Sequence, residues 1–261
     1  MTNISLSTVV SGSGPAIVLA HGAGGGIDAN FGSLIPLLRE RHTVIGSDYP
    51  ADDTPLDLDA LADALVDAAV DSGADDFTLI GYSLGSAVAI RAATRYPERV
   101  RALILAAGFA RADHRARATA ELWQRTIAAG DAGSFARVIL LAGFSAEFTN
   151  ALDPQQITDM IDQATTDIPG GVVAQAALVA AADVTADLPA LSVPTLVIAA
   201  TEDLLVDPAN SRDLAARIPG AEYTEIPAGH VLMLEHPDAW HTTILDFLTR
   251  HELDLPATAT R

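Results

Sequence analysis

The sequence predicts an α/β protein in which a mostly parallel sheet is covered by helices on both faces. Two observations support this. The chain contains continuous apolar runs, typical of buried parallel strands, and these runs alternate with segments of helical periodicity. A third is that the alternation stops between residues 111 and 186, where several helical segments occur without a clear strand. Such an insertion predicts a helical cap over the carboxyl edge of the sheet, with extra helices on the flank as the alternative.

The expected strands, about seven or eight in all, are short apolar runs bounded by turn residues. The first, Ile4–Val10, precedes a glycine turn and is expected to be antiparallel. The others are expected at Ala16–Ala20, Thr43–Gly46, Phe77–Ile80, Ala102–Ala106, Thr195–Ala200 and Tyr223–Ile226. Core helices are expected at Gly32–Arg41, Leu58–Ser72, Ser86–Tyr96, Asn210–Ile218 and Ala239–Arg250.

These elements divide the chain into two parts. Residues 1–110 and 187–261 are predicted to form the sheet-containing core, and residues 111–186 the inserted cap. Because Gly and Pro disfavour helix interiors, the cap helices are expected to be interrupted at four places. These are Gly130, Gly133, Pro154 and the run at 169–171.

The composition argues against several classes of function. The 261 residues carry a formal net charge of −19, which repels phosphate backbones and anionic lipid, so no nucleic-acid or membrane partner is expected. All 15 basic residues are arginine and cysteine is absent, which removes lysine Schiff bases, thiol nucleophiles and cysteine metal sites. No cofactor or metal is predicted. Without a visible secretory signal or spanning segment, we expect a cytoplasmic protein, with a homodimer as one option for its assembly.

The strongest catalytic signal is the pentapeptide GYSLG at residues 81–85. It follows the expected strand Phe77–Ile80 and precedes the expected helix Ser86–Tyr96, which is the context of a G-x-S-x-G nucleophile elbow. Such a turn exposes the serine hydroxyl at the sheet edge and directs the next backbone N–H toward the reacting centre. Ser83 is therefore the predicted nucleophile, and the N–H of Leu84 a predicted oxyanion donor.

A serine hydroxyl needs a base to accept its proton, and the base needs a carboxylate to orient it. His230 and Asp203 each follow an expected strand, and catalytic groups gather at the carboxyl ends of parallel strands. The chain order Ser, Asp, His also suits such a triad. We predict His230 as the general base and Asp203 as its partner. The alternatives are His42, His114, His236 and His241 for the base, and Asp113, Glu202 and Asp207 for the acid.

A second oxyanion donor is expected from the run HGAGGG at residues 21–26, which follows the strand Ala16–Ala20. Small residues let backbone approach a substrate closely, so we predict the N–H of Ala23 as this donor. His21 is expected to shape the loop by hydrogen bonding. The run lacks the G-x-G-x-x-G pattern, so no nicotinamide or flavin site is implied.

Together these motifs resemble the α/β-hydrolase superfamily, in particular its small capped esterases, lactonases and cofactor-free perhydrolases. The resemblance spans almost the whole chain, through residues 21–22, the Ser83 elbow, Asp203 and residues 229–237. It implies an α/β-hydrolase fold with a helical cap and oxyanion donors at Ala23 and Leu84. The sequence departs from many relatives at 47–53, where an Asp-Arg-Gly-x-Gly turn is missing. A serine at the elbow also differs from the aspartate of haloalkane dehalogenases and epoxide hydrolases.

The predicted activity is hydrolysis of a carboxylic ester, thioester or lactone through an acyl-enzyme on Ser83. C–C bond hydrolysis, perhydrolysis, acyl transfer and a slow-turnover ligand receptor or regulatory protein are alternatives on the same residues. The substrate is expected to be a small, mainly apolar acyl compound bound under the cap. Its pocket is predicted at Trp123, Leu140, Phe144, Phe148, Met160 and Val231, unless these side chains pack the core of the cap instead.

Overall fold

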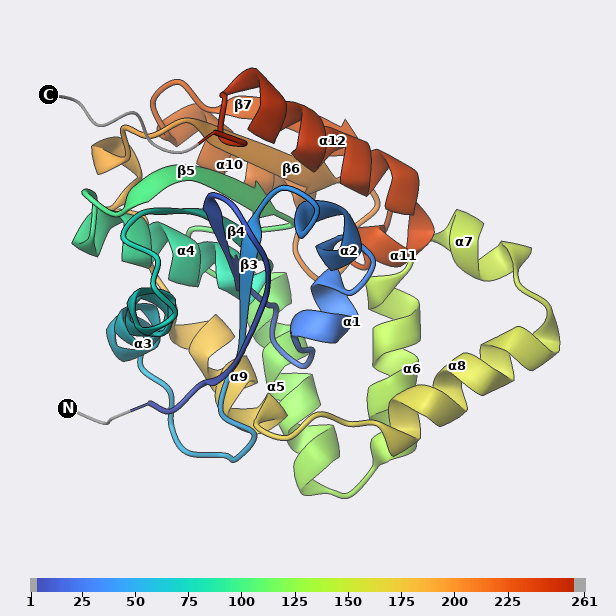
Figure 1. The fold of residues 1–261 in the computed structure, drawn as a ribbon. Coiled ribbons are helices and arrows are strands. Elements are labelled where there is room, and N and C mark those ends of the chain that lie inside the picture. Colours follow the sequence, from blue (N-terminus) through green and yellow to red (C-terminus); the bar gives the residue numbers. More distant parts are fainter. Residues whose placement is uncertain (1–3, 256–261) are drawn as a thin grey trace, which may run out of the picture.

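A computed structural model describes residues 4–255 and contains a seven-stranded sheet with helices on both faces (Figure 1). The strand order is β1-β3-β2-β4-β5-β6-β7; β1 is antiparallel to β3 and the other pairs are parallel. This confirms the predicted mostly parallel α/β sheet. The strands are β1 (Ser7–Gly12), β2 (Ala16–Ala20), β3 (Thr43–Asp48), β4 (Phe77–Tyr82), β5 (Val100–Ala106), β6 (Thr195–Ala200) and β7 (Glu222–Ile226).

Helices bury both faces of this sheet, which explains the continuous apolar strands. Alternate residues of a strand point to opposite faces. In β2, Ile17 and Leu19 join one buried cluster, while Val18 and Ala20 join the other. The first cluster is covered by α1 (Ile27–Phe31), α2 (Ile35–Leu38), α11 (Leu232–Glu235) and α12 (Pro237–Arg250). The second is covered by α3 (Leu58–Asp71), α4 (Leu84–Arg95), the short η1 (Leu188–Ala190) and α10 (Pro208–Arg217).

Two expectations about helix boundaries are wrong. The helix expected at Gly32–Arg41 is shortened to α2, because Pro36 has no N–H to donate to the carbonyl of Gly32 and its ring would clash there; α1, before this range, was not expected. Gly133 does not interrupt a helix but lies in the first turn of one. Asp131 caps that turn by accepting the N–H of Ser134 at 3.0 Å.

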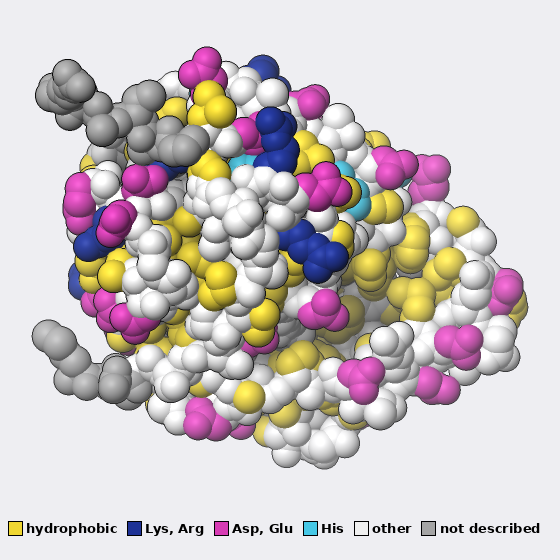
Figure 2. All heavy atoms as spheres, viewed as in Figure 1, with side chains coloured by type: hydrophobic (Ala, Val, Ile, Leu, Met, Phe, Trp, Pro, Cys, Tyr) yellow, Lys and Arg dark blue, Asp and Glu magenta, His cyan; other side chains and the backbone are white. Residues whose placement is uncertain are grey.

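The helical insertion lies between β5 and β6, as predicted. Its helices are α5 (His114–Ala128), α6 (Ala132–Gly143), α7 (Ala146–Ala151), α8 (Pro154–Thr166) and α9 (Val172–Ala181). Figure 1 shows α5 and α9 side by side next to the sheet, whereas α6, α7 and α8 extend away from it. We call α5 and α9 the inner helices and α6–α8 the outer arm. Figure 2 shows hydrophobic side chains along a hollow between the outer arm and the body of the molecule.

The two ends of the insertion are joined by backbone contacts. Arg111 and Asp183 form an isolated antiparallel bridge, and the N–H of Val184 donates to the carbonyl of Ala110 at 2.8 Å. This neck lies within a few residues of the expected cap limits, 111 and 186. It gives the insertion a paired entry and exit.

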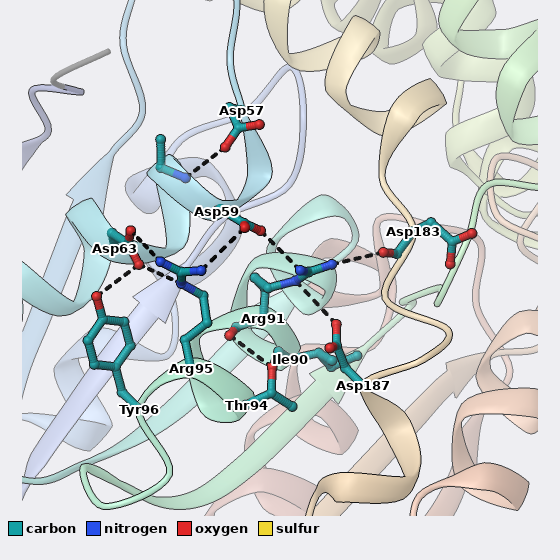
Figure 3. Close-up of polar contacts among 11 residues, drawn as sticks. Asp57, Asp59, Asp63, Ile90, Arg91, Thr94, Arg95, Tyr96, Asp183 and Asp187 are labelled. Carbon is teal, nitrogen blue, oxygen red and sulfur yellow. Dashed lines mark hydrogen bonds and ion pairs between the residues drawn. The ribbon is translucent and has the colours of Figure 1, made fainter. Parts of the chain in front are cut away.

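Arg91 of α4 fastens the returning segment to the core (Figure 3). Its guanidinium donates to the carbonyl of Asp183 at 3.0 Å and pairs with the carboxylates of Asp187 at 3.2 Å and Asp59 at 3.0 Å. One turn later, Arg95 makes two 2.7 Å hydrogen bonds to Asp63 of α3. The neck is therefore tied to the helix that follows the predicted nucleophile.

No helix among residues 4–255 is long and apolar enough to cross a membrane.

Candidate active site

Three side chains from separate segments form one hydrogen-bonded chain. His230 Nε2 lies 3.0 Å from Ser83 Oγ, and His230 Nδ1 lies 2.6 Å from Asp203 Oδ2. All three residues are more than nine-tenths buried. The other carboxylate oxygen, Asp203 Oδ1, accepts the N–H groups of Leu205 and Val206, both at 2.8 Å. The structure thus brings the predicted nucleophile, base and acid within the reach that proton transfer requires.

The local conformation of Ser83 explains why the sequence needs its two flanking glycines. Ser83 adopts φ 54° and ψ −120° between β4 and α4, a conformation that typically costs about 1–3 kcal/mol. A Cβ at Gly85 would lie 1.9 Å from the carbonyl oxygen of Ala20, and one at Gly81 would lie 2.4 Å from that of Gly85. Only glycine fits at either position, so strand and helix can meet closely enough to form the turn.

In the glycine-rich loop, the N–H of Ala23 is free at the cavity beside Ser83. The N–H of Gly22 donates to Asn30 Oδ1 and that of Gly24 to Gln175 Oε1, both at 2.9 Å. Between them, the N–H of Ala23 has no acceptor in the described part of the chain. Ala23 lines the same cavity as Ser83, so its N–H is available to a bound oxyanion.

His21 supports this loop with both ring nitrogens. Its Nδ1–H donates to the carbonyl of Gly22 at 2.8 Å, and its Nε2 accepts the N–H of Tyr49 at 3.0 Å. These partners fix the tautomer, because a carbonyl can only accept and an N–H can only donate. Burial lowers the pKa of His21, which favours this neutral form. The carbonyl of Gly22 belongs to the peptide unit that carries the Ala23 N–H, so His21 orients the candidate donor.

Two supporting residues were not identified from the sequence. The hydroxyl of Tyr82 donates to the backbone carbonyl of His230 at 2.8 Å and so positions the segment that carries the imidazole. Glu235 accepts the N–H of Gly229 at 3.1 Å and the hydroxyl of Ser145 at 2.6 Å, which joins the same segment to the outer arm. Their positions, inside the elbow and shortly after His230, were the available signals.

A cavity of about 40 Å³ lies beside Ser83 and His230. The inner helices form one wall of it, mainly through small side chains, and Trp123 of α5 is the largest residue on that wall. The wall residues from the inner helices are Ala116, Thr119, Ala120, Trp123, Ala176 and Val179. The site therefore offers a narrow space above the nucleophile.

Of the six predicted pocket residues, Trp123 lines this cavity and the other five do not. Phe144 and Phe148 stack on each other with ring centroids 5.2 Å apart, at the start of the outer arm's second helix. Leu140 and Met160 are half-buried on α6 and α8, and Val231 is half-buried after His230. The helical pattern marks these residues as inward-facing but does not say that α6–α8 extend away from the nucleophile.

Several alternative acids and bases have other partners. Asp113 and Asp207 cap the N-termini of α5 and α10 by accepting backbone N–H groups there. The Nε2 of His42 lies 3.2 Å from the carboxylate of Asp254, and His241 bonds to a serine hydroxyl. Both histidines are distant in the sequence from the elbow. His114 is exposed at the start of α5. None of these five side chains joins the hydrogen-bonded chain at Ser83 within residues 4–255.

Comparison with known proteins gives one consistent picture. A family model described as alpha/beta hydrolase fold matches residues 15–237. A pyrrolizixenacetamide deacetylase of Xenorhabdus hominickii is 32% identical over 256 residues, covering 95% of this chain and 96% of that protein.

Solved structures extend this similarity to the whole fold. The thermophilic esterase of Thermogutta terrifontis superposes with a TM-score of 0.82 at 26% sequence identity. The match covers 95% of this chain and 94% of the esterase chain. The enol-lactonase of Burkholderia xenovorans LB400 has a TM-score of 0.83 at 24% identity, with coverage of 95% and 98%. Because the coverage is nearly complete, core and insertion are both included in the likeness.

Proposed function

This chain belongs to the alpha/beta hydrolase family, and we propose that it cleaves a short-chain carboxylic ester, thioester or lactone through an acyl-enzyme on Ser83. The observation that carries the proposal is the hydrogen-bonded chain from Ser83 through His230 to Asp203 at the wall of a cavity. A free backbone amide at Ala23 beside that cavity supplies the other feature that acyl transfer needs.

In the first step, Ser83 Oγ forms a bond to the acyl carbonyl carbon while His230 Nε2 accepts the hydroxyl proton. The carbonyl electrons move to oxygen, and the N–H groups of Ala23 and Leu84 stabilise the resulting oxyanion. Collapse of this intermediate breaks the bond to the leaving group, which takes the proton from His230. Asp203 holds the imidazole in the required tautomer and stabilises its cation.

In the second step, water replaces the leaving group as the reactant. His230 accepts a proton from the water as its oxygen attacks the carbonyl carbon of the acyl-enzyme. The bond to Ser83 Oγ then breaks, the serine regains its proton and the carboxylic acid leaves.

The size of the cavity supports a short acyl group. Its volume is about 40 Å³. For scale, an apolar protein cavity of about 150 Å³ holds a benzene molecule. The present cavity therefore suits an acyl group of a few heavy atoms, and the name of the Xenorhabdus relative, a deacetylase, agrees with acetyl.

That name also favours a second candidate, hydrolysis of a small acetamide by the same residues. An amine leaves an acyl centre only after it has been protonated, and His230 Nε2 is placed to supply that proton. Turnover of acetanilides beside that of acetate esters distinguishes the two candidates.

The test is steady-state hydrolysis of p-nitrophenyl acetate, butyrate and octanoate. We expect acetate to be preferred, and Ser83→Ala to lower kcat/KM at least about 10³-fold because the nucleophile is lost. Ser211→Ala is the matched control, since this serine is also buried but lies on α10 outside the cavity. Wild-type rates in Ser83→Ala would refute the proposal. A single burst without turnover would favour the receptor alternative.

A further inference from the structure

We propose that Gln175, on the inner helix α9, is a positioning residue that holds the oxyanion loop in its active shape. The inference rests on the proposed hydrolase function and adds a role for the helical insertion. By this contact the insertion takes part in the chemical step, beyond covering the substrate. Gln175 itself touches no reacting atom in this mechanism.

The core and the insertion divide the work of holding residues 22–27. The core fixes the two ends: Gly22 N–H donates to Asn30 Oδ1 at 2.9 Å, and Ile27 N–H donates to Asp48 Oδ1 at 2.7 Å. The middle is held from the insertion, where Gln175 Oε1 accepts the Gly24 N–H at 2.9 Å. This contact joins residues 151 positions apart in the chain.

The hydrogen bonds fix consecutive peptide units around the candidate donor. His21 holds the carbonyl of Gly22, which shares a peptide unit with the N–H of Ala23. Gln175 holds the N–H of Gly24, which belongs to the next peptide unit. Gly24 has φ 69°, a region that glycine enters and leaves at little steric cost. Without Gln175, this flexible residue could turn and take the Ala23 N–H away from the nucleophile.

The placement of Gln175 is specific. It is 1% exposed and is the single polar residue of α9, whose sequence is otherwise Val, Ala and Leu. A buried amide without a partner is unfavourable, so its hydrogen bond to the loop is the contact that makes a glutamine acceptable there. In this otherwise apolar helix, the polar side chain marks the point where the insertion meets the oxyanion loop.

Two further contacts seat the inner helices on the core. A Cβ at Gly24 would lie 2.9 Å from Trp123 Cζ3, so the indole of α5 leaves no space above the loop. A Cβ at Gly171 would lie 2.2 Å from the carbonyl oxygen of Pro50, which seats the N-terminus of α9 on the core one turn before Gln175. Trp123 of α5 therefore contacts the loop that Gln175 holds, while the N-terminus of α9 packs on a separate core segment at Pro50.

The test compares Gln175→Leu, which removes the acceptor, with Gln175→Glu, which keeps an oxygen at the same reach. Leu178→Met is the matched control, because it alters a buried side chain of α9 that does not line the cavity. The measured quantities are kcat and KM for p-nitrophenyl acetate and the inhibition constant of a trifluoromethyl ketone. Ser83 Oγ adds to this ketone, its proton passes to His230, and the resulting oxyanion probes the donors directly.

For Gln175→Leu we expect kcat to fall about 10- to 100-fold with little change in KM, because only the transition state needs the aligned donor. Affinity for the trifluoromethyl ketone should fall by a similar factor, Gln175→Glu should recover part of both losses, and Leu178→Met should match wild type. If Gln175→Leu folds poorly, Gln175→Met replaces it, because methionine has nearly the length of glutamine and lacks its amide oxygen; the same losses of kcat and of ketone affinity are then expected. If Gln175→Leu has the same kcat as wild type, and the wild-type activity depends on Ser83, this inference is overturned while the proposed function stands. A fall in kcat without a fall in ketone affinity would overturn it as well.

Discussion

The inner helices and the outer arm belong to one insertion but are held in different ways. Half of α9 is buried, and α5 contributes four buried residues, including Trp123. In the arm, α7 and α8 contain no buried residue. Among the arm's helices, only α6 has buried residues, and its Phe135 packs on Trp123 of α5. The insertion therefore has a packed part against the candidate active site and an arm whose side chains stay partly exposed along α7 and α8.

The arm's helices are specified locally. In α8, Pro154 occupies the first turn, and Asp153 and Gln156 form a reciprocal capping box at its N-terminus. The inner helix α9 lacks a side-chain cap and begins after Gly171, yet it is the more deeply packed of the two. The comparison shows that burial, and not the strength of helix signals, identifies the part of the insertion that shapes the site.

The largest expected difference between the two halves is in stability. Trp123→Ala removes a buried aromatic side chain of an inner helix and should lower the free energy of unfolding by about 3–5 kcal/mol. Phe148→Ala in the arm removes a half-buried ring stacked on Phe144 and should cost only about 1 kcal/mol. Urea unfolding followed by circular dichroism measures both. Equal losses would contradict the division into a packed and an exposed half.

A smaller loss of stability is expected on acidification. It should arise from His21, in the core loop next to the inner helices. Burial lowers the pKa of His21 below its ordinary 6.5, so at mildly acidic pH the unfolded chain binds a proton there that the folded chain does not. Stability is then fully present above about pH 6.5 and falls as the pH drops toward the folded pKa. Residues 131–167 of the arm contain no histidine, so they should contribute nothing in this range.

The measurement is the Tm between about pH 7.5 and about pH 5.5 for wild type and for His21→Gln, which cannot titrate. We expect a smaller pH dependence in the variant. Some dependence should persist, because burial also lowers the pKa values of His42 and His241. An unchanged dependence of Tm on pH in the variant would contradict the lowered pKa of His21.

The structure brings together the three side chains that the sequence predicts for the site, and each of them has a local signature. Ser83 stands in a glycine-flanked turn between strand and helix, and Asp203 and His230 directly follow strands that parallel pairing brings to one edge. Their convergence follows from topology alone. The helix expected at Gly32–Arg41 failed for a reason visible in the sequence, since Pro36 has no N–H for a continuous helix.

The rest depended on contacts between distant segments. Gln175 meets Gly24 only because α9 returns over the loop, and no spacing rule links two residues so far apart in the chain. Phe144 and Phe148 have the apolar character of pocket residues, but they stack on each other and lie outside the cavity. Periodicity shows which face of a helix is buried and does not show what buries it.

The central claim is that His230 activates Ser83 as the nucleophile. Labelling with a fluorophosphonate tests it directly, because this probe forms a covalent bond to an activated serine oxygen and releases fluoride. Peptide mass spectrometry should find one label, on Ser83, and labelling should slow strongly in His230→Ala while Ser211→Ala is labelled as wild type. Labelling at another serine, no labelling at all, or an undiminished rate in His230→Ala would contradict the account.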